Sequence, residues 1–193
     1  MKTAFIIISS VFAIASILPY ISDVLKKKTK PRIVSWLTWS LLTAIASAAS
    51  FSDKQYASAI LTLIAAIETM TVVVLGYKHG DRKFNRLDVF CLRGVFVGLG
   101  LWAIFRSPAV AIIAILAIDF VGTIPTIKHS WQSPHEETTI TYILGLFASI
   151  FTLLAAKELK ITAVAFPLYL VLADLTIVVI LLTRHKSGFL KTE

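Results

Sequence analysis

Disulfides, metal-ligand clusters and catalytic motifs are all missing from this sequence. It has one cysteine, Cys91, among 193 residues, so no disulfide can form within the chain. The cysteine and the four histidines are scattered, which excludes the ligand spacing of a zinc site. There is no Gly-rich phosphate loop and no nucleophile with a base in a known catalytic motif. We therefore expect no enzyme activity and no cofactor.

Charged residues are also scarce. They make up 16% of the chain, against about a quarter of an average soluble domain. Hydrophobic residues reach 57%, and the mean hydropathy is +0.82. This apolar excess is too large for one soluble core, so it favours an integral membrane protein with membrane lipid as a partner.

The net charge of +8 would suit nucleic acid, but its distribution does not. Lysines and arginines lie in short stretches between apolar runs, such as "KKKTKPR" from residue 26 and "KHGDRKFNR" from residue 78. This pattern is typical of cytoplasmic loops in a membrane protein. We expect the chain to bind no nucleic acid.

Seven apolar runs approach the ~20 residues that a helix needs to cross the hydrocarbon core. Backbone groups in lipid have to be satisfied within their own segment, so each run is predicted to be a helix. The prediction is an all-α polytopic membrane protein with seven transmembrane helices. Their expected bounds are Ala4–Ile21, Ile33–Phe51, Tyr56–Tyr77, Val89–Phe105, Ala109–Ile127, Ile140–Ala156 and Ile161–Thr183.

The first run has features of a signal peptide, namely Lys2 and the small-residue pattern "AIA" before Ser16, but we expect it to be retained as a span. Seven spans place the two termini on opposite sides. The loops after spans one, three and five and the C-terminal tail carry 13 lysines and arginines, and the other side carries 5. This bias predicts an outside N-terminus and a cytoplasmic C-terminus. No organellar signal is evident, and we expect the membrane to be a prokaryotic inner (plasma) membrane.

The chain matches itself at an offset of 106 residues. The stretch "IAAIETMTVV" then aligns with "LVLADLTIVV", and Glu68 meets Asp174 within these apolar runs. Without a gap, Pro19 meets Pro125. Prolines and acids are rare in such runs, so they indicate a repeat more strongly than matching aliphatic residues do.

The repeat divides the chain into residues 1–77, a connecting span within residues 78–107, and residues 108–193. Three spans followed by one connector leave both three-helix units in the same orientation. Such parallel repeats are related by an axis along the membrane normal, and they can rock against each other around a central cavity. The expected architecture is therefore 3+1+3.

Three stretches resemble the SWEET and PQ-loop superfamily of small membrane carriers. The run "LPYISDVLKKKTKP" is similar to the family's proline near the end of span one and the basic loop after it. The runs "AIET" in span three and "VAFP" in span seven are similar to runs at those places in sugar carriers. With the 3+1+3 layout, the resemblance covers nearly the whole chain and implies a transporter.

The chain departs from this family at two points. The Pro-Gln dipeptide is absent, because neither Pro19 nor Pro125 is followed by glutamine. The positions of the pocket asparagines in sugar carriers correspond to Leu61 and Leu168. The resemblance therefore implies transport without identifying sugar as the solute.

Three acids inside the apolar runs, Glu68, Asp119 and Asp174, are the first candidate site residues. An ionised carboxylate at the bilayer centre costs at least ~2.5–3.5 kcal/mol on insertion scales, so these side chains are expected to face a cavity or another helix. They can couple transport to protons, recognise a cationic or hydroxyl-rich solute, or bond to neighbouring helices. The matching position in the first repeat is Ala13, so Asp119 has no acidic counterpart there. This asymmetry makes Asp119 the best candidate for a chemical role of its own.

Further candidates lie in spans two and six. Trp39 and Tyr142 can line a pocket and stack on a solute, or belong to an interfacial aromatic belt. Ser40 and Thr43, with Ser47, lie on one helix face. That face is either a cavity wall or a close contact with another helix, which is the commoner role of small residues in membranes.

Pro19, Pro125 and Pro167 each remove a backbone donor inside a predicted span. Such points can act as hinges, although prolines are also common in membrane helices without that role. The repeat favours hinges at Pro19 and Pro125, whereas Leu61 stands where a partner of Pro167 would be.

The sequence thus predicts a carrier that moves a small polar solute by alternating access, with proton coupling as a secondary hypothesis. The alternative is a ligand-binding or sorting receptor on the same fold, without net transport. A structural membrane subunit with all its acids paired is a third interpretation. Whether the chain forms a homo-oligomer is left open.

Overall fold

The computed structural model describes residues 2–27, 31, 33–78, 80, 86–132, 134 and 137–189. The side chains at 87, 88, 125, 128, 129 and 185–189 lie outside this description. The described residues form seven α-helices and no strand, so the all-α prediction is confirmed. The helices are α1 Lys2–Leu25, α2 Ile33–Ser52, α3 Tyr56–Gly76, α4 Arg86–Phe105, α5 Pro108–Gln132, α6 Thr139–Ala155 and α7 Ile161–Phe189.

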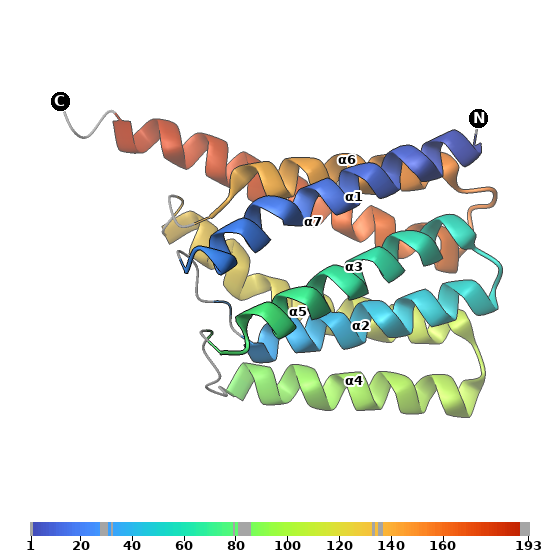
Figure 1. The fold of residues 1–193 in the computed structure, drawn as a ribbon. Coiled ribbons are helices and arrows are strands. Elements are labelled where there is room, and N and C mark those ends of the chain that lie inside the picture. The colour runs from blue at the N-terminus through green and yellow to red at the C-terminus, as the bar shows by residue number, and fades with distance from the viewer. Residues whose placement is uncertain are drawn as a thin grey trace.

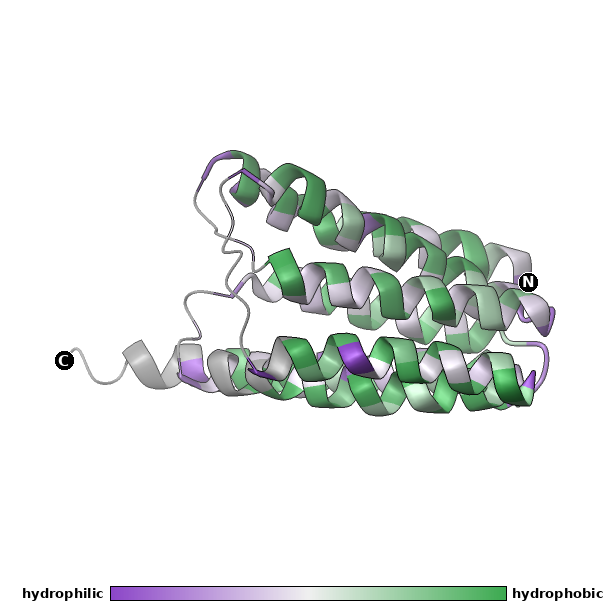
Figure 2. Cartoon of the chain, turned by 90° about the horizontal axis from the view of Figure 1, so that it is seen from below, coloured by the Kyte–Doolittle hydropathy of each residue, from purple (hydrophilic) through white to green (hydrophobic). Residues whose placement is uncertain are grey.

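Hydrophobic residues run along every helix, and hydrophilic ones gather near helix ends and in the connecting segments (Figure 2). Among the described helices, α1, α2, α3 and α7 are long and apolar enough to cross a membrane. The apolar stretches of α4, α5 and α6 are shorter, at Val89–Phe105, Pro108–Ile124 and Thr139–Ala155. Length and composition therefore support an integral membrane protein with four candidate spans.

The helices lie side by side as a bundle (Figure 1). α3 packs against both α1 and α2, and α7 packs against both α5 and α6, so the helices form two rows. Between the rows, α1 contacts α6, α2 contacts α5 and α7, and α3 contacts α6 and α7. α4 packs on α5 and α2 at the edge of the bundle, and the start of α1 and the end of α7 lie at opposite ends (Figure 1).

Small residues allow α2 and α3 to approach closely. Ala49 and Ala59 are fully buried. Ser47 Oγ donates a hydrogen bond to the carbonyl oxygen of Ala59 at 2.9 Å, and Ser40 Oγ donates to that of Ala66 at 3.1 Å. The polar face predicted on this helix therefore includes two serines that contact α3, in the way small residues commonly join membrane helices.

α1 is held against α6 by a polar and an aromatic contact. Ser9 Oγ donates to the carbonyl oxygen of Ala148 at 2.8 Å and lies 2.6 Å from Thr152 Oγ1. One turn further, the ring of Phe12 stacks on that of Phe151 with centroids 5.7 Å apart. Because the two helices belong to different rows, this contact joins the rows along one side of the bundle.

The larger apolar core lies on the other side, between α2, α4, α5 and α7. Its buried members are Leu42, Ala46, Ala49, Val95, Ala111, Ile112, Ile115 and Phe166. In lipid there is little hydrophobic drive between helices, so such a core stabilises the bundle mainly through van der Waals packing.

Candidate functional site

Asp119 lies in the middle of α5 and is 7% exposed. Its carboxyl group interacts with the hydroxyl group of Tyr169 from α7. That hydroxyl also lies 2.7 Å from Thr123 Oγ1, which donates to the carbonyl oxygen of Asp119 at 2.9 Å. Since a tyrosine hydroxyl carries one proton, it can donate to only one of its two neighbours at a time. The arrangement can therefore hold Asp119 with or without a proton.

Asp174 faces a glycine of the adjacent helix. A Cβ added at Gly145 of α6 would lie 2.8 Å from Asp174 Oδ2, so only glycine leaves the carboxyl group in place. Asp174 is close enough to Asp119, and also to Tyr142, for their charges to interact. The structure thus brings three predicted site residues together.

Aromatic side chains continue this polar region toward α1 and α2. The Tyr142 hydroxyl donates to Glu137 Oε2 at 2.7 Å, and Glu137 lies within electrostatic range of Tyr20. The ring of Tyr20 lies 4.7 Å from that of Trp36, and Trp36 meets Trp39 edge-on at 5.5 Å. The Trp36 side chain is therefore packed among aromatic neighbours inside the bundle.

Trp39 connects this aromatic group to α5. A Cβ added at Gly122 would lie 3.6 Å from Trp39 Nε1, so the indole reaches the part of α5 next to Asp119. We call the linked side chains the interior cluster, and its members are Tyr20, Trp36, Trp39, Asp119, Tyr142, Tyr169 and Asp174. They come from α1, α2, α5, α6 and α7, and they offer carboxyl groups, hydroxyl groups and flat ring faces. Such a set can bind a small polar solute by hydrogen bonding and stacking.

Three predicted site residues, Ser40, Thr43 and Glu68, lie outside the interior cluster. The one described bond from them to a cluster member joins Thr43 to Trp39 within α2. Ser40 bonds to α3, and Thr43 Oγ1 donates to the carbonyl oxygen of Trp39 at 2.7 Å within its own helix. Glu68 is partly buried, and its Oε1 is buried without a hydrogen-bond partner among the described residues. Buried polar atoms normally have partners, so Glu68 retains hydrogen-bonding capacity that the described side chains do not use.

The three prolines lie within helices. Pro19 interrupts the hydrogen bonding of α1, and the fully buried Pro167 interrupts that of α7. Pro125 falls within α5, and its side chain lies outside the described residues. Their use as hinges stays a prediction.

Sequence reasoning did not name Tyr20, Trp36, Tyr169, Thr123 or Gly145 as site residues. Thr123 is four residues after Asp119, a spacing that puts both on one helix face and could have been noticed. Tyr169 and Gly145 gave no such signal, because their roles depend on which helices are neighbours.

At the end where α1 begins, polar contacts join the two rows (Figure 1). Ser50 Oγ of α2 donates to the carbonyl oxygen of Thr162 at 3.1 Å, and the Thr162 hydroxyl donates to the Asp53 carboxylate. Nearby, Lys160 Nζ lies 2.8 Å from Glu158 Oε2, and this partner raises the pKa of Lys160. The end of α2 is therefore bonded to the start of α7 at this end.

Comparisons with known proteins do not add a relative to this description. No family model, no curated protein and no solved structure matches the chain. The resemblance to SWEET and PQ-loop carriers stays a prediction from the sequence.

Proposed function

We propose that the chain is a membrane carrier that moves a small polar solute by alternating access between two three-helix units. The observation that carries this proposal is the pattern of helix neighbours. If α1, α2 and α3 are exchanged with α5, α6 and α7, each contact between the two units maps onto an observed contact. The contact of α1 with α6 maps onto that of α5 with α2, and the contact of α3 with α6 maps onto that of α7 with α2. Two like units around an axis along the bundle would have this pattern, with α4 as the connector.

In this proposal all seven helices cross the bilayer, including the shorter α4, α5 and α6. They lie alongside the four longer helices in one bundle, which supports a common crossing direction (Figure 1). The N-terminus is placed outside and the C-terminus in the cytoplasm, following the excess of lysine and arginine in the loops at the C-terminal end.

The solute is assigned to the interior cluster, because its members come from both proposed units. In this proposal the bonds of Ser50 and Asp53 to Thr162 lie at the outside end and help to hold that end closed. Alternating access then requires these bonds to break when the outer end opens. The contact between the Asp119 carboxyl group and the Tyr169 hydroxyl group, which can donate or accept a hydrogen bond, supports proton coupling as a second part of the proposal.

Uptake by reconstituted protein tests the proposal. The purified chain is first screened for thermal stabilisation by sugars, amino acids, vitamins and nucleosides, because a ligand of the folded state raises the melting temperature. A stabilising solute is then offered, in radiolabelled form, to liposomes that contain the chain and to empty liposomes. We expect accumulation only with the chain. Binding without net flux would favour the alternative, a ligand-binding or sorting receptor, over the carrier.

Gly145 provides a test of the site that does not change any polar group. In Gly145→Ala the new methyl group would meet Asp174 Oδ2 at 2.8 Å, so the carboxyl group has to move away. We expect uptake to fall several-fold while the melting temperature changes little, because a terminal carboxyl group can rotate more easily than a helix can shift. Gly100→Ala is the matched control, since no atom lies within 4 Å of a Cβ there. Equal uptake by both variants would contradict the role of Asp174.

A further inference from the structure

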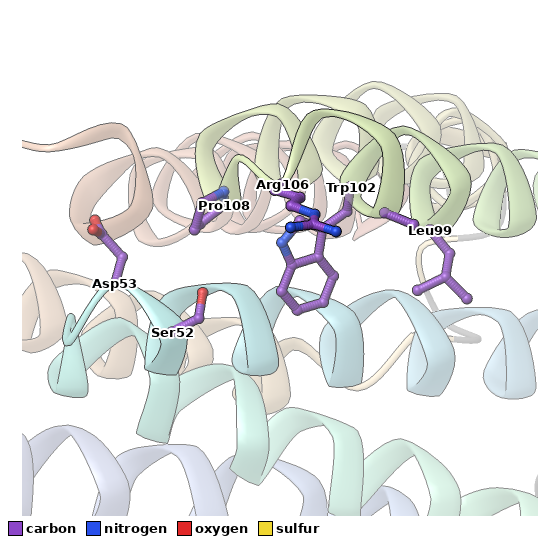
Figure 3. A pocket seen from close by; sticks show the side chains of 7 residues that line it. Ser52, Asp53, Leu99, Trp102, Arg106 and Pro108 are labelled. Atoms are coloured by element: carbon purple, nitrogen blue, oxygen red, sulfur yellow. The ribbon is translucent and has the colours of Figure 1, made fainter.

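An open cavity of about 690 Å³ lies between the end of α2, the end of α4 and the start of α5 (Figure 3), and none of its lining residues belongs to the interior cluster. It is lined by Ser52, Asp53, Leu99, Trp102, Ala103, Arg106 and Pro108. Ser52 and Asp53 approach it from α2, and the other residues approach it from the α4–α5 side (Figure 3). Its size suits a small molecule or a lipid headgroup.

Two tight turns shape the cavity. α4 ends where Arg106 adopts a left-handed conformation, with φ of 48° and its N–H donating to the carbonyl oxygen of Trp102 at 2.8 Å. α5 then starts at Pro108, whose fixed φ suits the first position of a helix. On the other side, Lys54 has a φ of 58° directly after Asp53 and ends α2. Side chains of opposite charge are thereby set on two sides of one cavity.

Both charges have capacity for a ligand. Arg106 is exposed, and its guanidinium has no ion pair or hydrogen bond among the described side chains. Asp53 accepts the hydroxyl of Thr162 through Oδ2 and lies within electrostatic range of Lys160, and its other oxygen remains for a ligand. The indole of Trp102 points from α4 toward α2, next to the Arg106 side chain in this view (Figure 3). The cavity therefore combines a cation, an anion and an aromatic surface.

The apolar wall of the cavity continues onto the outside of the bundle. α4 packs only on α5 and α2 among the described helices, so its other side faces outward. Phe96, Ile104 and Phe105 are 68%, 76% and 61% exposed there, and Leu99 in the cavity wall is 44% exposed. A cavity with charges at the helix ends and an apolar wall along an edge helix matches the headgroup and acyl chain of a membrane lipid.

We propose that this cavity binds a zwitterionic phospholipid with an amine-bearing headgroup. The phosphate pairs with Arg106, because a guanidinium presents two parallel N–H groups to phosphate oxygens. The ammonium group pairs with Asp53, and an acyl chain lies along α4 over Leu99. Trp102 lies at the boundary between headgroup and chain, where tryptophan is enriched in membrane proteins. This inference does not depend on transport.

Native mass spectrometry of the full chain in detergent, titrated with phosphatidylethanolamine or phosphatidylglycerol, tests the assignment. We expect the chain to bind phosphatidylethanolamine more tightly, and Arg106→Gln to weaken binding of both lipids about tenfold or more, as expected for a lost charge-assisted hydrogen bond. Ala103→Trp fills the cavity without changing charge and should cause a similar loss. Lys157→Gln makes the same charge change on an exposed residue at the same end, outside the cavity, and should bind normally.

Asp53→Asn and Thr162→Val separate the headgroup contact from the bond between the rows. Asp53→Asn should abolish the preference for phosphatidylethanolamine, whereas Thr162→Val, which does not line the cavity, should preserve it. Equal affinity of the native chain for both lipids would overturn the ammonium contact. Normal binding by folded Arg106→Gln and Ala103→Trp would overturn the site. Soluble phosphoethanolamine binding as tightly as the lipid would assign the cavity to a solute instead.

Discussion

Replacing Asp119 by Asn is expected to reduce solute uptake into liposomes at least about tenfold, while the protein remains folded. The amide keeps the size of the side chain but cannot ionise. A hydrogen bond to a charged group is worth about 1.5–3 kcal/mol, and each 1.4 kcal/mol is a factor of ten in an equilibrium constant. The expected loss is therefore large whether Asp119 contacts the solute or carries a proton.

Two companion variants sharpen this experiment. Asp23→Asn changes the same atoms near the end of α1, outside the interior cluster, and should transport normally. Tyr169→Phe removes only the hydroxyl that interacts with Asp119, and it should reduce uptake less than Asp119→Asn does. Native rates for a well-folded Asp119→Asn protein would remove this residue from the mechanism.

The pH dependence of uptake separates the two roles of Asp119. If the carboxyl group carries a proton across the membrane, uptake by the native chain varies with the pH gradient and uptake by Asp119→Asn does not. If the carboxyl group only binds the solute, a pH gradient drives no accumulation in either protein. Initial rates measured with and without an inward proton gradient distinguish these outcomes.

The helices themselves were predictable because the apolar runs are long and separated by charged segments. The third span was expected at Tyr56–Tyr77 and the helix covers Tyr56–Gly76, a difference of one residue. The first span was expected at Ala4–Ile21, but α1 extends over Lys2–Leu25. Hydropathy marks the part of a helix that suits lipid, while the helix continues until a turn such as the one at Lys27, with its φ of 60°, ends it.

The neighbours of each helix were less predictable than its bounds. The polar face of α2 was recognised from the spacing of Ser40, Thr43 and Ser47. The sequence could not decide whether that face lined a cavity or touched a helix, because the same small polar residues serve both purposes. The bonds of Ser40 and Ser47 to α3 favour the helix contact for those two residues.

The candidate site was predicted through its rare residues and missed through its common ones. An acid in an apolar run is costly, so Asp119 and Asp174 were conspicuous in the sequence. Tyr169 was not, because tyrosine is frequent in membrane proteins and its importance comes from its place opposite Asp119. The cavity at Arg106 was missed for a similar reason, since its charges come from turns that lie far apart in the sequence.

Gly76→Ala at the end of α3 is expected to destabilise the chain. The added Cβ would lie 2.4 Å from Pro31 Cγ and 3.2 Å from Ile33 Cδ1, in a buried position. A proline ring cannot rotate away as a flexible side chain can, so the segment that leads into α2 has to move. Gly80 lies against the same segment, because a Cβ there would lie 2.6 Å from the carbonyl oxygen of Pro31.

Overpacking of this kind costs about 1–3 kcal/mol, and the helix preference for alanine over glycine returns only about 0.5–1 kcal/mol. We therefore expect Gly76→Ala to lower the melting temperature of the purified protein by several degrees. Gly98→Ala is the matched control, because its Cβ would meet Ala114 Cβ at an ordinary 3.6 Å inside α4, and it should be neutral or slightly stabilising. Adding Pro31→Ala to Gly76→Ala removes the ring and should restore much of the lost stability, since substitutions in direct contact are not additive. A double variant no more stable than Gly76→Ala alone would show that the contact with Pro31 is not what limits the approach of α3 to α2.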